Sequence, residues 1–126
     1  MKQNPFEKYL TQEDHLQFQI MWYIYGQYRN RCLFFHVPNE GKRSAFERFK
    51  FKKLGAKRGV SDILILRSGP RFLAMEVKVI YASGQKNKAT PDQTIFLEDV
   101  KKYDGESMTV WTFEEAKIII DEFMKD

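Results

Sequence analysis

Cysteine, histidine and long apolar runs are scarce in this chain of 126 residues. The single cysteine, Cys32, excludes an intrachain disulfide, and with His15 and His36 it offers too few soft ligands for a zinc site. Any metal ion must therefore be bound by oxygen atoms. No apolar run reaches the roughly 18 residues that a membrane span requires, and the first residues lack the apolar core of a signal peptide. We expect a cytoplasmic protein with no membrane partner.

The length and composition favour one globular domain over residues 1–126. Hydrophobic residues make up 43% of the chain and aromatic residues 15%, which is enough apolar surface to form a core. The sequence contains no internal repeat and no low-complexity stretch that would indicate a second module.

Basic residues are concentrated in one segment. The net charge is only +4, but residues 42–58 carry eight basic residues against one acidic residue. This excess indicates an anionic partner such as nucleic acid, although a charge run alone is also typical of a solvated helix face. Phe46, Phe49, Phe51 and Leu54 alternate with the basic residues, so we expect them to pack this segment against the core.

The pattern of apolar residues, caps and turn residues predicts alternating helices and strands. We expect helices over 13–28, from 45 to Gly55, from 91 to Gly105 and from 113 onward, and strands over 33–37, 62–66, 72–80 and 108–111. The order is α-β-α-β-β-α-β-α, an α/β fold with a central mixed sheet. Tyr103 is expected on the buried stripe of the third helix, and Ile118 on the apolar stripe of the last. Trp22, Tyr23 and Tyr25 lie on the first helix, and we interpret them as core or subunit-interface residues rather than base-stacking residues.

The second and third strands form a hairpin around Gly69 that brings two acids together. A turn centred there pairs residues whose numbers sum to 138, so Asp62 lies opposite Glu76, with Cβ atoms roughly 5 Å apart. Because side chains alternate, Lys78 lies on the same face. Two opposed carboxylates destabilise a sheet unless a cation compensates, and all-oxygen ligation suits Mg²⁺ or Mn²⁺. The pattern predicts metal-assisted phosphodiester hydrolysis; the alternative is an ordinary Glu–Lys surface pair on an edge strand.

An ordered set of motifs resembles the VRR-NUC family (virus-type replication-repair nucleases) of the PD-(D/E)XK nuclease superfamily. The motifs are Glu13 with Gln17 four residues later, the strand ending in Pro38-Asn39, the segment Lys53-Leu-Gly-Ala-Lys-Arg-Gly-Val-Ser-Asp62, Glu76-Val-Lys78, and Thr90-Pro-Asp-Gln93. Ser61 stands where the family usually has proline, and the loop 81–89 is longer and more basic than usual. The resemblance implies the restriction-endonuclease-like core.

The resemblance also implies roles for individual residues. Asp62, Glu76 and the backbone carbonyl of Val77 would bind the metal ion, and Lys78 would position the attacking water. Glu13 would complete the acidic cluster, directly or through a water, unless it merely complements the helix dipole. Gln93 would support Lys78 or the scissile phosphate, and it is also the capping-box partner of Thr90.

We therefore expect an Mg²⁺- or Mn²⁺-dependent deoxyribonuclease. By analogy it would be a homodimer that cuts branched DNA, such as a four-way junction or flap, during replication, recombination or repair, in a bacterial cell or a phage-infected host. The residues expected to bind nucleic acid are Asn39, Lys42, Arg43, Lys52, Lys57, Arg58, Lys86 and Lys88. The alternatives are a non-catalytic DNA-binding module of the same fold and, less well supported, a nucleotide phosphohydrolase.

Overall fold

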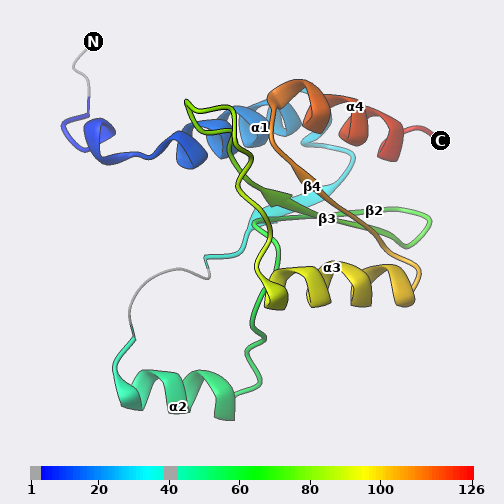
Figure 1. Ribbon diagram of the computed structural model, residues 1–126. Helices are drawn as coiled ribbons and strands as arrows, with labels where there is room; N and C mark the ends of the chain where they lie inside the picture. Colours follow the sequence, from blue (N-terminus) through cyan, green and yellow to red (C-terminus); the bar gives the residue numbers. More distant parts are fainter. Residues whose placement is uncertain (1–3, 39–42) are drawn as a thin grey trace.

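The computed structural model describes residues 4–38 and 43–126. Asn39 and Lys42, both expected to bind DNA, lie outside these residues. In chain order the elements are the 3-10 turn η1 (Glu7–Tyr9), α1 (Gln12–Tyr28), β1 (Leu33–His36), α2 (Ala45–Lys53), β2 (Ile63–Arg67), β3 (Arg71–Val77), α3 (Pro91–Lys102), β4 (Glu106–Val110) and α4 (Phe113–Phe123). The α/β fold is as expected, with η1 added before the first helix (Figure 1).

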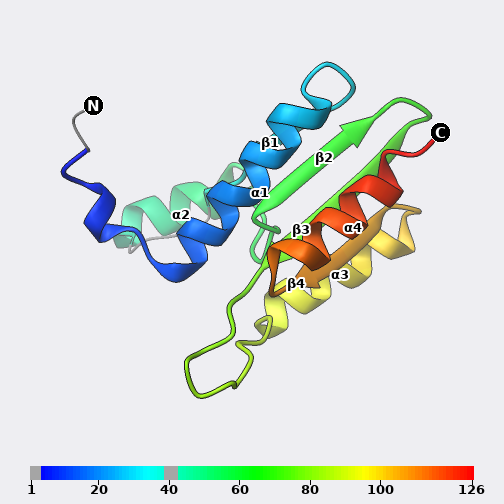
Figure 2. The same cartoon turned by 90° about the horizontal axis from the view of Figure 1, so that it is seen from above.

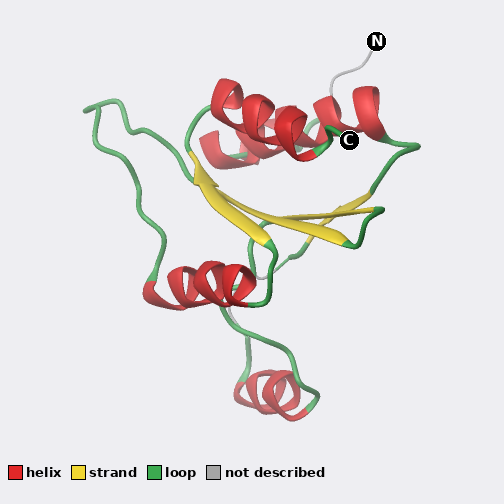
Figure 3. Ribbon diagram, turned by 90° about the vertical axis from the view of Figure 1, so that its right-hand side faces the viewer, coloured by secondary structure: helices red, strands yellow, loops and turns green. Residues whose placement is uncertain are grey.

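The strands form one mixed sheet in the order β1-β2-β3-β4. The first three strands are antiparallel to their neighbours, and β4 is parallel to β3 because α3 provides the crossover between them. Helices α1 and α4 lie on one face of the sheet and α3 on the other, while α2 lies farther out on the α3 side (Figures 1 and 3). The expected mixed sheet with helices on both faces is confirmed.

The core lies between the sheet and the α1–α4 layer. Alternate residues of β2 and β3, such as Ile63 and Met75, point into this layer and are fully buried. They pack with Ile20 and Ile24 of α1 and with the buried face of α4. Seen from above, α1 and α4 lie side by side over the strands (Figure 2). The opposite face of the same strands is therefore left for the acidic residues.

The predicted hairpin register is confirmed. Leu64 pairs with Ala74 and Leu66 with Phe72, both with numbers that sum to 138. Gly69 has φ of 87°, a left-handed conformation that glycine adopts without the strain of a side chain. Strand β3 ends at Val77 rather than at Ile80, so its predicted C-terminal end was wrong by three residues.

Side-chain caps explain where the helices begin. Capping boxes precede α1, α2 and α3 at Thr11, Ser44 and Thr90, and each pairs with the residue three positions later. Helix α2 ends in a Schellman arrangement: the N–H of Gly55 donates to the Lys52 carbonyl and the N–H of Ala56 to the Phe51 carbonyl. The expected termination at Gly55 is thus confirmed.

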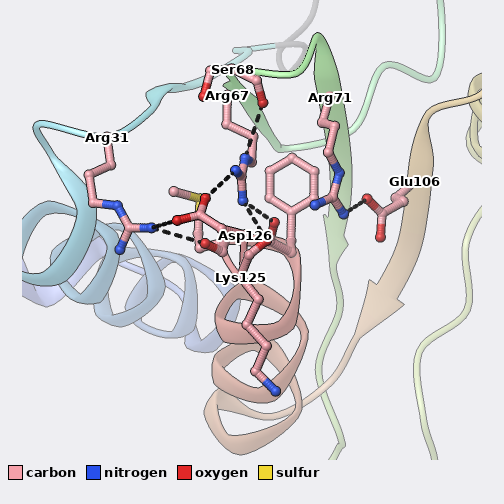
Figure 4. Close-up of polar contacts among 9 residues, drawn as sticks. Arg31, Arg67, Ser68, Arg71, Glu106, Lys125 and Asp126 are labelled. Carbon is pink, nitrogen blue, oxygen red and sulfur yellow. Dashed lines mark hydrogen bonds and ion pairs between the residues drawn. The ribbon is translucent and has the colours of Figure 1, made fainter.

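Two arginines, Arg31 and Arg67, fix the C-terminal end of the molecule (Figure 4). Arg67 donates to the carbonyls of Phe123 and Lys125, at 3.0 and 2.9 Å, and pairs with the Asp126 carboxylate. Arg31 donates to the Met124 carbonyl. These cations satisfy the last carbonyls of α4 and complement the negative end of its dipole. They hold α4 onto the sheet far from the acidic residues.

Four predicted placements were wrong. Phe46, Phe49 and Leu54 do not pack on the core: they are 68%, 62% and 74% exposed, and within the described chain α2 has no buried residue. Tyr103, expected on the buried stripe of α3, is exposed.

The other two concern α4 and the last strand. Ile118 lies on the outer face of α4, while Ile120 is buried. The last strand covers Glu106–Val110 rather than 108–111. The helical spacing of apolar residues predicts that one face of a helix is apolar, but it does not predict which element of the fold covers that face.

Candidate active site

Asp62 lies at the start of β2, where backbone bonds from β1 fix its position. The N–H of Val37 donates to the Asp62 carbonyl at 3.0 Å, and His36 Nδ1 lies 2.7 Å from the same oxygen. The Asp62 side chain accepts a hydrogen bond of 2.7 Å from the backbone N–H of Val77. His36 therefore contacts the backbone of Asp62 from β1.

Glu76 lies on β3, and only 1% of its surface is exposed. Burial, and next the charge of Asp62, raise its pKa from 4.5 to about 8, with Glu13 adding a smaller effect. Lys78 acts in the opposite direction. Its Nζ lies 3.6 Å from Glu76 Oε1. The other carboxylate oxygen, Oε2, is buried without a hydrogen-bond partner among the described residues.

Lys78 follows the last residue of β3 and is itself buried. Its backbone N–H donates to the Val110 carbonyl of β4, at 2.9 Å, so the chain stays beside the sheet after the strand ends. A buried ammonium group next to a buried carboxylate supplies a fixed positive charge at this end of the sheet. The expected grouping of Asp62, Glu76 and Lys78 is therefore present in the structure.

A cavity of about 270 Å³ opens beside Asp62. Glu13, Asp62 and Gln93 line it, and Arg58 contributes a cation. Glu13, in the first turn of α1, is partly buried. Gln93 accepts a hydrogen bond from the Thr90 N–H at 2.8 Å, so its expected capping role is present and its side chain also borders the cavity.

Gly59 brings the segment before Asp62 against the start of α3. It has φ of 75°, and a Cβ atom there would lie 2.3 Å from the Asp92 carbonyl oxygen and 2.7 Å from the Gln93 nitrogen. Both atoms are backbone and cannot move aside easily. A residue without a side chain is therefore required to place Arg58 and Asp62 beside the cavity.

The expected DNA-binding residues occupy different positions around this site. Arg58 lines the cavity, and Lys52, Lys57 and Lys88 are exposed. Two others contact aromatic rings: Arg43 lies 4.0 Å from the centre of the Phe51 ring, and Lys86 lies 4.7 Å from that of Trp111. Figure 1 shows that α2 and the loop after β3 extend from the sheet in different directions.

The acidic residues fit a hard divalent cation. Glu76 Oε2 is a buried oxygen without a partner in the described chain, and two further carboxylates act on its pKa. Within residues 4–38 and 43–126, no three His, Cys, Asp or Glu side chains form a ready metal cluster. Mg²⁺ commonly uses one or two protein carboxylates and completes its octahedron with water and phosphate oxygens, so two carboxylates suffice.

Two features of the site were missed from the sequence. Asp92 lines the cavity with Gln93. His36 and Val37 fix the Asp62 backbone from β1. The first-turn position of Asp92 was a signal only for helix capping, and the contacts of His36 depend on strand pairing across 26 residues.

The comparisons with known proteins bear on the fold. No protein-family model and no curated protein matches the chain. A solved structure described as a VRR_NUC domain protein superposes with a TM-score of 0.68 over 90% of this chain and 88% of that chain, at 24% sequence identity. The chain has a VRR-NUC nuclease fold.

The predicted resemblance is thus confirmed in the arrangement of the backbone. Within the VRR-NUC fold of this chain, the acidic pair and Lys78 lie at the end of the sheet where β3 finishes and β2 begins. None of the described helices is long and apolar enough to span a membrane.

Substitution of Gly59 should damage the site more than substitution of an equally left-handed glycine. Gly55→Ala meets open space, and it should cost about 1 kcal/mol for the positive φ alone. Gly59→Ala adds a backbone clash with α3 and should cost about 2 kcal/mol more. Urea unfolding of both variants measures the difference, and equal losses would contradict the proposed close approach.

Stability without metal should depend on the charge of Glu76. Its folded pKa of about 8 exceeds the ordinary 4.5, so between these values the folded chain binds more protons than the unfolded chain. Stability contributed by this group therefore falls as pH rises from about 4.5 to 8. Glu76→Gln should raise the free energy of unfolding at pH 8 by on the order of 1 kcal/mol or more.

Urea unfolding in EDTA at several pH values tests this expectation. Glu98→Gln removes an exposed carboxylate of α3 and is the matched control, with no change expected. If the Glu76→Gln protein is less stable than wild type at pH 8, then the ionised carboxylate does not destabilise the folded state, and the expectation is wrong.

Proposed function

We propose that this protein is a divalent-metal-dependent DNA endonuclease that hydrolyses phosphodiester bonds. The observation that carries the proposal is the carboxylate of Glu76, which lies next to Asp62. Its Oε2 is buried without a hydrogen-bond partner among the described residues, and its Oε1 lies 3.6 Å from the Lys78 ammonium nitrogen. A buried acid with a raised pKa, beside a second acid and an amine, is typical of catalytic sites. The VRR-NUC fold supports the same interpretation.

In this proposal Asp62, Glu76 and the Val77 carbonyl bind Mg²⁺ or Mn²⁺, and Glu13 completes the negative charge of the site. The bound ion supplies Lewis-acid activation of water and of the scissile phosphate. Lys78 orients the attacking water and stabilises charge that develops on a phosphoryl oxygen. Gln93 orients the phosphate from the first turn of α3.

The substrate is proposed to be duplex DNA with branches. Arg43, Lys52, Lys57, Arg58, Lys86 and Lys88 provide cations for phosphates, and such contacts position a duplex without reading its sequence. We propose a homodimer, which would present two active sites to the two strands of a junction. The protein would act in the cytoplasm, in DNA recombination or repair.

Cleavage should require both the metal ion and the acid–amine cluster. Purified wild type should nick labelled four-way junctions, flaps and linear duplexes in Mn²⁺ or Mg²⁺, with the branched forms cut faster, and it should be inactive in EDTA. Asp62→Asn and Lys78→Ala should each lose at least about 100-fold in rate, because each removes stabilisation of the transition state. Glu98→Gln is the control and should cut normally.

The alternatives give different results in the same assay. DNA binding without metal-dependent nicking by wild type would favour a non-catalytic binding module. Hydrolysis of deoxynucleoside triphosphates with intact DNA would favour a nucleotide phosphohydrolase. Equal nicking by Asp62→Asn and wild type would place the activity elsewhere.

DNA affinity should fall steeply with salt. Each neutralised phosphate contributes about 0.9 to the slope of log affinity against log salt. Arg58→Ala and Lys88→Ala should each weaken binding uniformly across sequences and lower the slope by about 1. Fluorescence anisotropy with a labelled duplex in EDTA measures both, and Lys125→Ala, at the C-terminal end, is the control. Affinity independent of salt would contradict phosphate binding.

A further inference from the structure

Within the described chain, no residue of helix α2 is buried. It contains nine residues, and a helix this short is not stable in water without packing. Phe46 and Phe49 of the helix and its C-cap residue Leu54 are nevertheless exposed, while Phe51 is partly buried. Figures 1 and 3 show the helix separated from the sheet and from α3. Residues 4–38 and 43–126 therefore leave these side chains without a covering element.

The sheet has an uncovered apolar face on the same side. Leu33 and Phe35 of β1 pair with Leu66 and Leu64 of β2, so their side chains share one face. Leu33, Phe35 and Leu66 are exposed. On this side α3 packs against β3 and β4. Among the described residues of the first two strands, Leu64 on this face is partly buried.

A cavity of about 590 Å³ adjoins this face, between α3 and the β2–β3 turn. Phe72, Phe96 and Tyr103 contribute apolar walls. Asp99 and Asp104 contribute two carboxylates, and Lys57 contributes one cation. The exposed apolar residues of the first two strands and the cavity together form an apolar hollow with acidic residues at one side, which we call the α3-side hollow.

The chemistry of α2 matches the α3-side hollow. Its aromatic residues alternate with Arg48, Lys50, Lys52 and Lys53, so it presents both apolar and basic groups. The hollow presents apolar groups and two carboxylates against one lysine. DNA phosphates can pair with Lys52, as proposed above, but they would leave the apolar side chains of the helix and of β1 in water. A protein surface of the hollow's composition covers both.

We propose that α2 of one copy packs into the α3-side hollow of a second copy, and that the second copy reciprocates. The inference rests on the homodimer of the proposed function and names its interface. Buried aromatic residues remove about 150–250 Å² each from water, so two reciprocal contacts approach the roughly 800 Å² per partner of a specific interface. The contact is isologous and closes at two copies.

Mass measurement tests the interface without metal or DNA. By light scattering after gel filtration, wild type should have twice the chain mass of 15.0 kDa. Phe46→Ser with Phe49→Ser, and separately Leu66→Ser, should weaken dimerisation at least 100-fold and give monomers with unchanged circular dichroism. Ile118→Ser replaces an exposed apolar residue of α4 and should remain dimeric.

Disulfide trapping distinguishes two copies from one. In a Cys32→Ser background, separately purified Phe49→Cys and Leu66→Cys chains should form a covalent heterodimer when mixed and oxidised. A double variant that forms only an intramolecular disulfide would mean that α2 closes onto its own sheet and would overturn the proposal.

Other results would also overturn it. These are a wild-type monomer at all concentrations, α2 protected from proteolysis only when DNA is added, or a dimer lost on Trp22→Ser but retained by the α2 variants. Asp62→Asn should remain dimeric. An inactive dimer would therefore refute the nuclease and leave this interface standing, and an active monomer would do the reverse.

Discussion

The structure depends on one unfavourable arrangement, a carboxylate buried beside another carboxylate. Glu76 is inaccessible to solvent, Asp62 lies next to it, and Lys78 compensates only part of the charge. An ionised group in such surroundings destabilises the folded state. The arrangement persists because the opposite face of the same strands is packed with Ile63 and Met75 against α1 and α4. Strain at functional sites is commonly sustained in this way by a rigid scaffold.

The acidic cluster could be predicted from the sequence because it depends on local rules. A tight turn at Gly69 fixes the hairpin register, and the alternation of side chains then places Glu76 and Lys78 on one face. Asp62 was placed by extending the same register one residue beyond β2, and its bond to the Val77 N–H agrees with that position. The starts of the helices followed for a similar reason, since caps act within three residues.

Contacts between distant elements could not be predicted in the same way. The aromatic residues of α2 are spaced for a buried face, and the sequence offered no means to tell that this face would be left open in one copy. The close approach of Gly59 to Asp92 is set by tertiary packing between residues more than 30 positions apart. From the sequence alone, Gly59 could be interpreted only as a turn residue. Tyr23 is a further example: its helical spacing fitted an interface, but its hydroxyl is hydrogen-bonded to Asp121 of α4.

The position of α2 and the chemistry of the site are connected through the segment that joins them. After the Schellman end of α2, the chain passes Lys57 and Arg58, is fixed by Gly59 against α3 and then reaches Asp62. Residues 54–58 lie between α2 and the close contact at Gly59, which fixes their C-terminal end. A second copy that binds α2 would fix this segment at both ends and would reduce the entropy lost when its cations bind a phosphate backbone. Dimerisation would then organise the basic surface beside each acidic cluster as well as bring two clusters together.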